Sequence, residues 1–236
     1  LFQLTHRIDL TPDLSLTTIA YHHDFARNWY KLQGINSGGT GASGDVSISS
    51  VLADPVTYAA EYDLAVGTTS LDNSIVYRAN RRAYYSEGVQ SVLNWKTAFA
   101  GIDHELTIGA RVHQDEEDRF QEEDAYRLEG GRLVLTTAGA AGSQANRISS
   151  GEALAIFVQD KFTVGRLLVT GGARFEDYEL TREDYSTSDP TRAAGPTQVR
   201  ELSDTVVVPG LSALYQISET TTLLAGVHRG FAIASP

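Results

Sequence analysis

Apolar and polar side chains alternate residue by residue in several separate stretches of this 236-residue chain. The first stretch covers residues 2–10, and the pattern returns in residues 105–113, 154–162, 167–176 and 207–216. Successive side chains of a β-strand point to opposite faces, so a period of two indicates strands with one apolar and one polar face. Helical spacing does not fit these stretches, and we therefore expect an all-β fold.

The connections between the strands alternate between short and long. The tight connections are 11–13, 100–103, 164–165 and 218–220. The long connections are expected at about 31–74, 115–150 and 182–203. Strands of about ten or more residues, with short turns at one end and long loops at the other, are typical of an outer-membrane β-barrel. About eight strands, paired as antiparallel hairpins, are expected to form a transmembrane β-barrel or part of one.

Two architectures are compatible with this number of strands. Eight strands are enough to close a small barrel. The long segments are larger than the loops of small barrels, however, and the last strand, 223–231, stops before residues 234–236 without a partner strand. The chain also begins at Leu1 inside an alternating stretch and contains no Met. We therefore expect residues 1–236 to form one partial barrel domain, an arc of a larger barrel.

The composition excludes several classes of function. The 30 acidic and 19 basic residues give a formal net charge of −11, which argues against nucleic acid as a partner. The absence of Cys excludes a disulfide framework, a thiolate zinc site and a cysteine nucleophile. No apolar stretch is long enough for a membrane-spanning helix. Motifs of phosphate-binding loops, serine hydrolases and zinc proteases are absent, so neither an enzyme nor a bound cofactor is expected.

Five segments resemble strand motifs of TonB-dependent outer-membrane receptors, especially those of the ferric dicitrate type. They are Phe25–Leu32, Gly109–Gln121, Ile156–Phe162, Gly172–Glu176 and Gly226–Phe231. This resemblance spans nearly the whole chain and implies a 22-stranded barrel. It implies a receptor in the outer membrane of a Gram-negative bacterium that imports a ferric chelate, ferric citrate or a siderophore, with energy from the TonB complex. The plug that contacts TonB, the TonB box, the signal peptide and the closing C-terminal strands are then expected outside residues 1–236.

Arginine outnumbers lysine 16 to 3 and supplies the candidate ligand site. The planar guanidinium group suits two-pronged recognition of carboxylates, such as those of a ferric citrate complex. We expect a cationic throat where the first long loop re-enters the barrel and where the next strand reaches its loop. Its candidate residues are Arg78, Arg81, Arg82, Arg111, His113 and Arg119. The alternative is that inward arginines pair with acidic residues of the plug or of neighbouring strands.

No metal site is predicted. His22 and His23 are adjacent, so a strand would direct them to opposite faces. The acidic run 115–118, followed by 122–124, lacks the spacing of a calcium-binding loop. It is expected to be a solvated loop, bridged by divalent ions to lipopolysaccharide.

Aromatic residues near the predicted strand ends are expected at the membrane interface, where rings with one polar end are favoured. They are Trp29, Tyr30, Tyr84, Tyr85, Trp95 and Phe162. Two other functions remain open. One is a small self-contained barrel acting as an adhesin or a structural outer-membrane protein. The other is a barrel enzyme with His113 and Asp115 at its rim.

Overall fold

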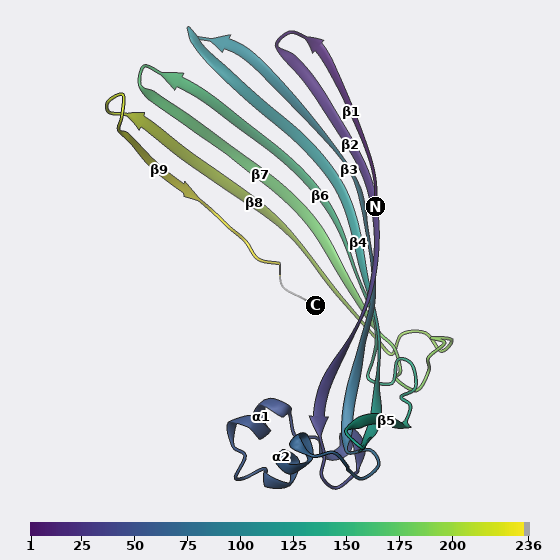
Figure 1. Cartoon of the computed structure of the whole chain (residues 1–236). Coiled ribbons are helices and arrows are strands. Elements are labelled where there is room, and N and C mark those ends of the chain that lie inside the picture. The colour runs from purple at the N-terminus through teal and green to yellow at the C-terminus, as the bar shows by residue number, and fades with distance from the viewer. Residues whose placement is uncertain (234–236) are drawn as a thin grey trace.

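A computed structural model describes residues 1–233 as one curved antiparallel sheet (Figure 1). Eight strands follow one another across it in the order β1-β2-β3-β4-β6-β7-β8-β9, and β5 pairs only with β4. The strands are β1 (Phe2–Thr11), β2 (Leu14–Ile35), β3 (Ile75–Phe99), β4 (Ile102–Glu129), β5 (Arg132–Thr137), β6 (Ala145–Val164), β7 (Leu167–Asp184), β8 (Gln198–Gln216) and β9 (Thr222–His228). The predicted all-β antiparallel class and the count of about eight strands are confirmed.

The sheet does not close on itself. Strands β1 and β9 form its two edges, and no pairing joins them within residues 1–233 (Figure 1). Each edge presents backbone N–H and C=O groups to a further strand, and in lipid such groups must be paired. The hypothesis of a small closed barrel is therefore wrong for this chain, and the arc of a larger barrel is confirmed.

The register of the strands separates the side chains into two faces. Val112 of β4 lies opposite Val89 of β3 and Leu154 of β6, and these apolar side chains share what we call the outer face. Val112 is 54% exposed, and apolar neighbours along the sheet are exposed to a similar degree. A single-layered sheet with a continuous exposed apolar band is suited to contact with lipid. The opposite, more polar side is the inner face.

Strands β3 and β4 are 25 and 28 residues long, although about 9–11 residues cross a membrane. They continue past the apolar band towards the end of the sheet that carries the long connections (Figure 1). The expected loop over 115–150 is therefore wrong, because β4 extends to Glu129 and β6 begins at Ala145. The acidic run 115–118 lies inside β4, and its side chains alternate between the two faces. Arg119, expected at the start of a loop, also lies inside β4.

The first long connection is confirmed, although β2 extends into its predicted range as far as Ile35. It contains a 3₁₀ turn (Gly41–Gly44) and the helices α1 (Ile48–Ala53) and α2 (Ala59–Val66). The N-cap of α1 is the side chain of Ser47, which accepts a hydrogen bond from the Ser50 amide at 3.1 Å. Neither helix is long and apolar enough to cross a membrane, and the same holds for the rest of the described chain.

A small apolar core attaches this connection to the sheet. Ile35 of β2, Leu64 of α2 and Ile75 of β3 are buried against one another. The backbones of Ile35 and Val46 exchange two hydrogen bonds of 2.9 Å. The connection is therefore a packed structure at the long-loop end of the sheet.

Pro209 lies inside β8 without an irregularity in the pairing. It lies opposite Ala173 in an unbroken register between β7 and β8. On its other side, β9 ends at His228, opposite Gly210. The missing N–H of Pro209 therefore falls where the neighbouring strand has ended, a position that tolerates proline.

Replacing Gly109 by alanine is expected to destabilise the complete barrel by about 1–3 kcal/mol. The ring of Phe157 lies over Gly109, and an added Cβ would clash with the Cζ and Cε atoms of that ring. The measurement is the temperature at which the folded band disappears in heat-modifiability gels. Gly210→Ala is the matched control, because its nearest contact would be an ordinary 3.6 Å. Equal transition temperatures for the two variants would contradict this account.

Candidate functional site

Four arginines lie directly opposite one another across four adjacent strands. Arg27 of β2 is paired with Arg82 of β3, Arg82 with Arg119 of β4, and Arg119 with Arg147 of β6. Positions directly opposite in a sheet share a face, and this register falls on the inner face beyond the apolar band. The strands thus place four guanidinium groups in one row.

The adjacent register adds two further arginines from β7 and β8. Arg182 lies opposite Ser149 of β6 and opposite Arg200 of β8, on the same face. The six residues form what we call the arginine belt: Arg27, Arg82, Arg119, Arg147, Arg182 and Arg200. These two registers contain only two carboxylates, Glu117 and Asp184, on the inner face, so the belt carries an excess of four positive charges in a chain of net charge −11.

The two carboxylates neutralise only part of the belt. One oxygen of Glu117 forms an ion pair with Arg82 at 3.0 Å and accepts a hydrogen bond from the Nε atom of Arg119 at 3.0 Å. Asp184 accepts one from Arg182 at 2.7 Å. Arg147 forms no ion pair within residues 1–233.

Two donors of the belt are unused. The Nε atoms of Arg27 and Arg82 are buried, and neither has a hydrogen-bond acceptor in the described part of the chain. Like charges directly opposite one another destabilise a sheet, and buried donors without acceptors add to this cost. A bound anion would reduce the repulsion between the guanidinium groups, so this arrangement suits a ligand with several negative groups.

The structure divides the six arginine and histidine candidates into four groups. Arg82 and Arg119 lie in the belt. Arg78 is on the same face, four residues closer to the long connections than Arg82, and its Nε atom donates to Glu123 at 2.8 Å. Arg111 and His113 lie further towards the tight turns.

Both residues of this last group contact the hydroxyl of Tyr21. The Nε atom of Arg111 lies 3.1 Å from that oxygen, and Nδ1 of His113 lies 2.7 Å from it. The ring of Tyr21 lies over Gly88 to reach these two residues. A Cβ added to Gly88 would lie 2.5 Å from the Tyr21 hydroxyl, so the ring occupies the space that a side chain at position 88 would need. His113 is thus held within the wall of the sheet, away from the loop tips.

Arg81 is the candidate that the fold separates from the others. It follows Arg78 by three positions and precedes Arg82 by one, so it points to the outer face, where it donates to Glu122 at 2.7 Å. An inner-face ligand is out of its reach.

Sequence reasoning missed four residues of the belt. Arg147, Arg182 and Arg200 fall in segments predicted as long loops, and Arg27 falls in a segment that is assigned to a strand only by its resemblance to a receptor motif. Beyond the membrane both faces of a strand meet water, so the apolar face that marks a strand disappears there. In each strand, inward and outward positions alternate in the apolar half. Continuing this alternation into the polar segment places these arginines on the inner face.

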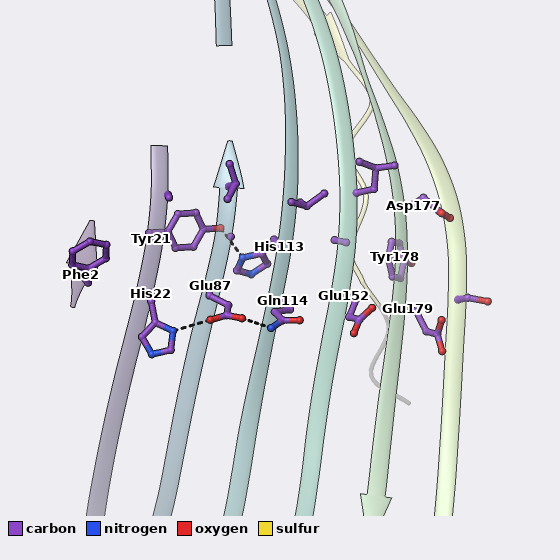
Figure 2. A pocket seen from close by; sticks show the side chains of 17 residues that line it. Phe2, Tyr21, His22, Glu87, His113, Gln114, Glu152, Asp177, Tyr178 and Glu179 are labelled. Atoms are coloured by element: carbon purple, nitrogen blue, oxygen red, sulfur yellow. Dashed lines mark hydrogen bonds and ion pairs between the residues drawn. The ribbon is translucent and has the colours of Figure 1, made fainter. Parts of the chain in front are cut away.

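The outer face has the opposite charge just beyond the apolar band. His22, Glu87 and Gln114 form a hydrogen-bonded row, with His22 Nδ1 2.9 Å from Glu87, and Glu152 and Glu179 continue the row across the sheet (Figure 2). They border a groove of about 760 Å³. Negative groups therefore collect on the outer face and positive groups on the inner face. No group of three or more His, Asp or Glu residues suited to a metal ion occurs in residues 1–233.

His113 and Asp115, the pair considered for a barrel enzyme, do lie near each other. His113 Nε2 is 3.5 Å from an Asp115 carboxylate oxygen. The other ring nitrogen of His113 already faces Tyr21. This pair is one part of a polar network along the inner face.

The aromatic residues divide between the two faces. Trp95 of β3 and Phe162 of β6 are on the outer face at the tight-turn end, where a membrane interface is expected. Trp29 and Tyr84 instead project from the inner face, which is a correction to their predicted place at the interface. The reason is that alternate residues of a strand point to opposite faces, and both residues occupy inward positions of β2 and β3.

The first long connection is expected to dock more tightly at acidic pH. Burial raises the pKa of Asp45 from 3.8 to about 6, the charge of Glu123 acts in the same direction, and Arg78 opposes it. The docked connection therefore binds a proton more tightly than the undocked one. Docking should strengthen as the pH falls from about 6 towards 3.8, and should be weakest above pH 6, where Asp45 is charged.

Amide hydrogen exchange at Ile35 and Val46 measures this effect, since these two backbones pair across the connection. Protection factors, corrected for the intrinsic pH dependence of exchange, should be higher at pH 5 than at pH 7.5. Asp45→Asn should remove the difference and raise protection at pH 7.5. A pH difference that persists in Asp45→Asn would assign the effect to another group.

An open arc of long antiparallel strands, with a lipid-suited outer face and a charged inner face, defines a segment of a transmembrane β-barrel. Residues 3–236 match the family model described as TonB dependent receptor-like, beta-barrel, and the chain belongs to this family. Members of this family are transporters of the outer membrane of Gram-negative bacteria rather than enzymes. No curated protein matches the sequence.

Solved structures of such receptors have the same fold. The chain is similar to the ferric citrate transporter FecA in its unliganded form, with a TM-score of 0.65 and 16% identity over 96% of this chain and 26% of that one. The closed form of the ferric-catecholate import receptor Fiu from E. coli K12 has a TM-score of 0.66 and 13% identity, with 96% and 32% covered. The siderophore receptor PiuA from Acinetobacter baumannii has a TM-score of 0.63 and 10% identity, with 95% and 30% covered. The chain spans about a quarter to a third of the length of these receptors.

Proposed function

We propose that this chain is the part of a TonB-dependent receptor that recognises an anionic ferric chelate and admits it to the barrel. The observation that carries the proposal is the arginine belt, with its four uncompensated positive charges. Ferric complexes of citrate and of many siderophores are negatively charged, and a guanidinium group binds carboxylates through two parallel hydrogen bonds. Arg82 and Arg119 contact the ligand directly in this proposal, while Arg78, Arg111 and His113 line its path.

The names of the structural neighbours support the iron-bearing part of the proposal. FecA transports ferric citrate, and Fiu imports a ferric catecholate. Because the chain spans only part of the length of such receptors, the partners of the whole protein are proposed as well. We infer that a plug domain fills the barrel and contacts the TonB complex.

The membrane partners follow from the outer face. The apolar band contacts outer-membrane lipid in this proposal. The acidic row that borders it, with Glu87, Glu152 and Glu179, lies at the level of the lipid head groups, where divalent ions link carboxylates to lipopolysaccharide. The location is accordingly the outer membrane of a Gram-negative bacterium.

The test is uptake of radioactive iron by cells whose only outer-membrane iron receptor is the complete protein. Iron supplied as ferric citrate or as a ferric siderophore should accumulate, and deletion of the TonB gene should abolish accumulation. Cells with an empty vector give the background. Accumulation that is equal with and without TonB, or that never exceeds background for any anionic chelate, would refute the proposal.

A further inference from the structure

One register of the outer face carries polar and small side chains inside the apolar band. His6 of β1 lies opposite Thr18 of β2. Thr18 lies opposite Ser91 of β3, and Ser91 lies opposite Ala110 of β4. Ala110 precedes Val112 by two positions in β4, so this register projects from the outer face as Val112 does. We call His6, Thr18, Ser91 and Ala110 the membrane patch.

Apolar registers flank the membrane patch on both sides. Leu16 and Leu93, which are paired with each other, lie towards the tight turns, and Val89 lies towards the long connections. The patch is therefore enclosed by the band that is suited to lipid, and its His6 side chain is exposed there. Lipid tails offer no hydrogen-bond partner, so an ionisable side chain at this level of a barrel wall points to a functional contact.

The same register changes its character across β6, β7 and β8. Its residues there are Ile156, Phe175 and Val207, which are between 38% and 48% exposed. Large apolar side chains suit contact with lipid, whereas the patch presents hydroxyl and imidazole groups and no bulky apolar group. Because both halves belong to one register of one sheet, the polar character is a local property of β1–β4.

The polar groups of the patch are able to bind copies of themselves. The hydroxyl oxygens of Thr18 and Ser91 are 2.9 Å apart, and one proton between them leaves the second O–H group for a further acceptor. A hydroxyl and a neutral imidazole each offer both a donor and an acceptor. Two molecules related by a two-fold axis next to Thr18 would therefore present matching groups to each other. Small side chains would let the two walls approach closely.

The acidic row above the apolar band also favours contact over β1–β4. There the carboxylate of Glu87 accepts hydrogen bonds from His22 and Gln114. Over β6 and β7, Glu152 and Glu179 lie directly opposite one another, and such carboxylates on two molecules would repel. A second molecule therefore approaches more favourably on the side that carries the membrane patch.

We propose that the membrane patch is a lateral interface, at which two copies of the receptor associate in the plane of the outer membrane. The partner is a second copy of this chain, because groups that are both donor and acceptor complement themselves, whereas lipid tails leave them without partners. This inference goes beyond the proposed function. It relies on contact between the outer face and lipid, and it does not depend on the identity of the ligand.

The experiment is disulfide cross-linking of the complete receptor in cells, with Thr18→Cys or Ile156→Cys as its single cysteine. Residues 1–236 contain no native Cys that would interfere. Oxidation of Thr18→Cys should give a covalent dimer of twice the receptor mass. Ile156→Cys is the matched control, because it lies in the same register three strands away and is the more exposed of the two positions. Its dimer yield should be at least about tenfold lower.

A second pair of variants tests the chemistry of the contact. His6→Leu combined with Ser91→Ala removes polar groups and leaves the outer face suited to lipid. The dissociation constant of the dimer in lipid vesicles, measured by energy transfer on dilution, should rise about tenfold, the scale for two lost hydrogen bonds in a membrane. Ile156→Ala should leave the constant within about twofold, and heat modifiability checks that each variant folds.

Equal dimer yields from Thr18→Cys and Ile156→Cys would indicate random collision and would overturn the interface. A cross-link of Thr18→Cys to a protein of another mass, or none at all, would also overturn it. Iron uptake is measured in the same cells. Normal uptake without a dimer would leave the proposed function standing, whereas a dimer without uptake would refute the proposed function and support the interface.

Discussion

Replacing Arg119 and Arg147 together by glutamine is expected to lower the affinity of the complete receptor for ferric citrate by at least about 100-fold. A hydrogen bond to a charged group contributes about 1.5–3 kcal/mol, and both side chains lie in the row that faces the ligand. Arg82 remains to pair with Glu117, so the double change leaves no carboxylate without a partner. Isothermal titration at low and high salt measures the affinity. The native affinity should fall as salt rises, and the variant should depend less on salt.

The control is Arg81→Gln in β3, next to Arg82 of the belt, which removes one positive charge where the double variant removes two. Its guanidinium group pairs with Glu122 on the outer face, so ligand affinity should remain within about twofold. Folding of each variant is checked by heat modifiability. Loss of affinity in Arg81→Gln as large as in the double variant would show that net charge, and not the belt, controls binding.

Replacing Asp118 by alanine is expected to detach the connection between β7 and β8, residues 185–197. Asp118 on β4 receives two hydrogen bonds from Arg192, at 2.6 and 3.1 Å. The Nε atom of Arg192 donates to Asn146 at 2.7 Å, and its guanidinium group lies 5.2 Å from the ring centre of Phe120 and 5.0 Å from that of Tyr185. This side chain links the connection to two strands, and Asn146 adds hydrogen bonds from its Nδ2 atom to the carbonyls of Ser186 and Asp189 at 3.0 Å.

The loss of the paired charge should cost about 2 kcal/mol of local stability, after allowance for partial exposure of both groups. Hydrogen exchange in residues 185–197 should then accelerate about 30-fold, while exchange in the apolar half of the sheet stays unchanged. Asp103→Ala, an acidic residue at the tight-turn end of the same strand, is the control and should have no effect on these amides. Arg192→Ala added to Asp118→Ala should accelerate exchange further, because it also removes the hydrogen bond to Asn146 and the two ring contacts. No acceleration in either variant would mean that Arg192 does not anchor the connection.

The sequence by itself determined the fold class, because lipid requires one apolar face on every spanning strand. For this reason apolar and polar residues alternate in residues 2–10, 105–113 and 154–162. The alternation of tight and long connections then predicts that these strands pair as antiparallel hairpins in the wall of a barrel. The resemblance to TonB-dependent receptors depended on the same strand segments. The family match over residues 3–236 confirms it.

The ends of the strands could not be predicted for the same physical reason. Above the apolar band, strands β3, β4 and β6 have water on both faces, so residues 115–129 read as a polar loop although backbone pairing continues through them. Residue propensity and periodicity indicate whether a side chain faces water or an apolar environment. They do not locate the end of a strand that has water on both faces and is stabilised only by backbone pairing with its neighbours.

The candidate site was predictable in kind but not in membership. An excess of arginine over lysine indicated recognition of an anion, and the tertiary structure decided which arginines act together. Arg27, Arg82, Arg119 and Arg147 are spread over 120 positions of the chain and meet only through the registers of four strands. Arg81 and Arg82 are neighbours in sequence, yet they are separated by the full thickness of the sheet. The residue type therefore determined which ligand chemistry the site can recognise. The face and the partner of each side chain were determined by the strand register, which depends on pairings between residues far apart in the chain.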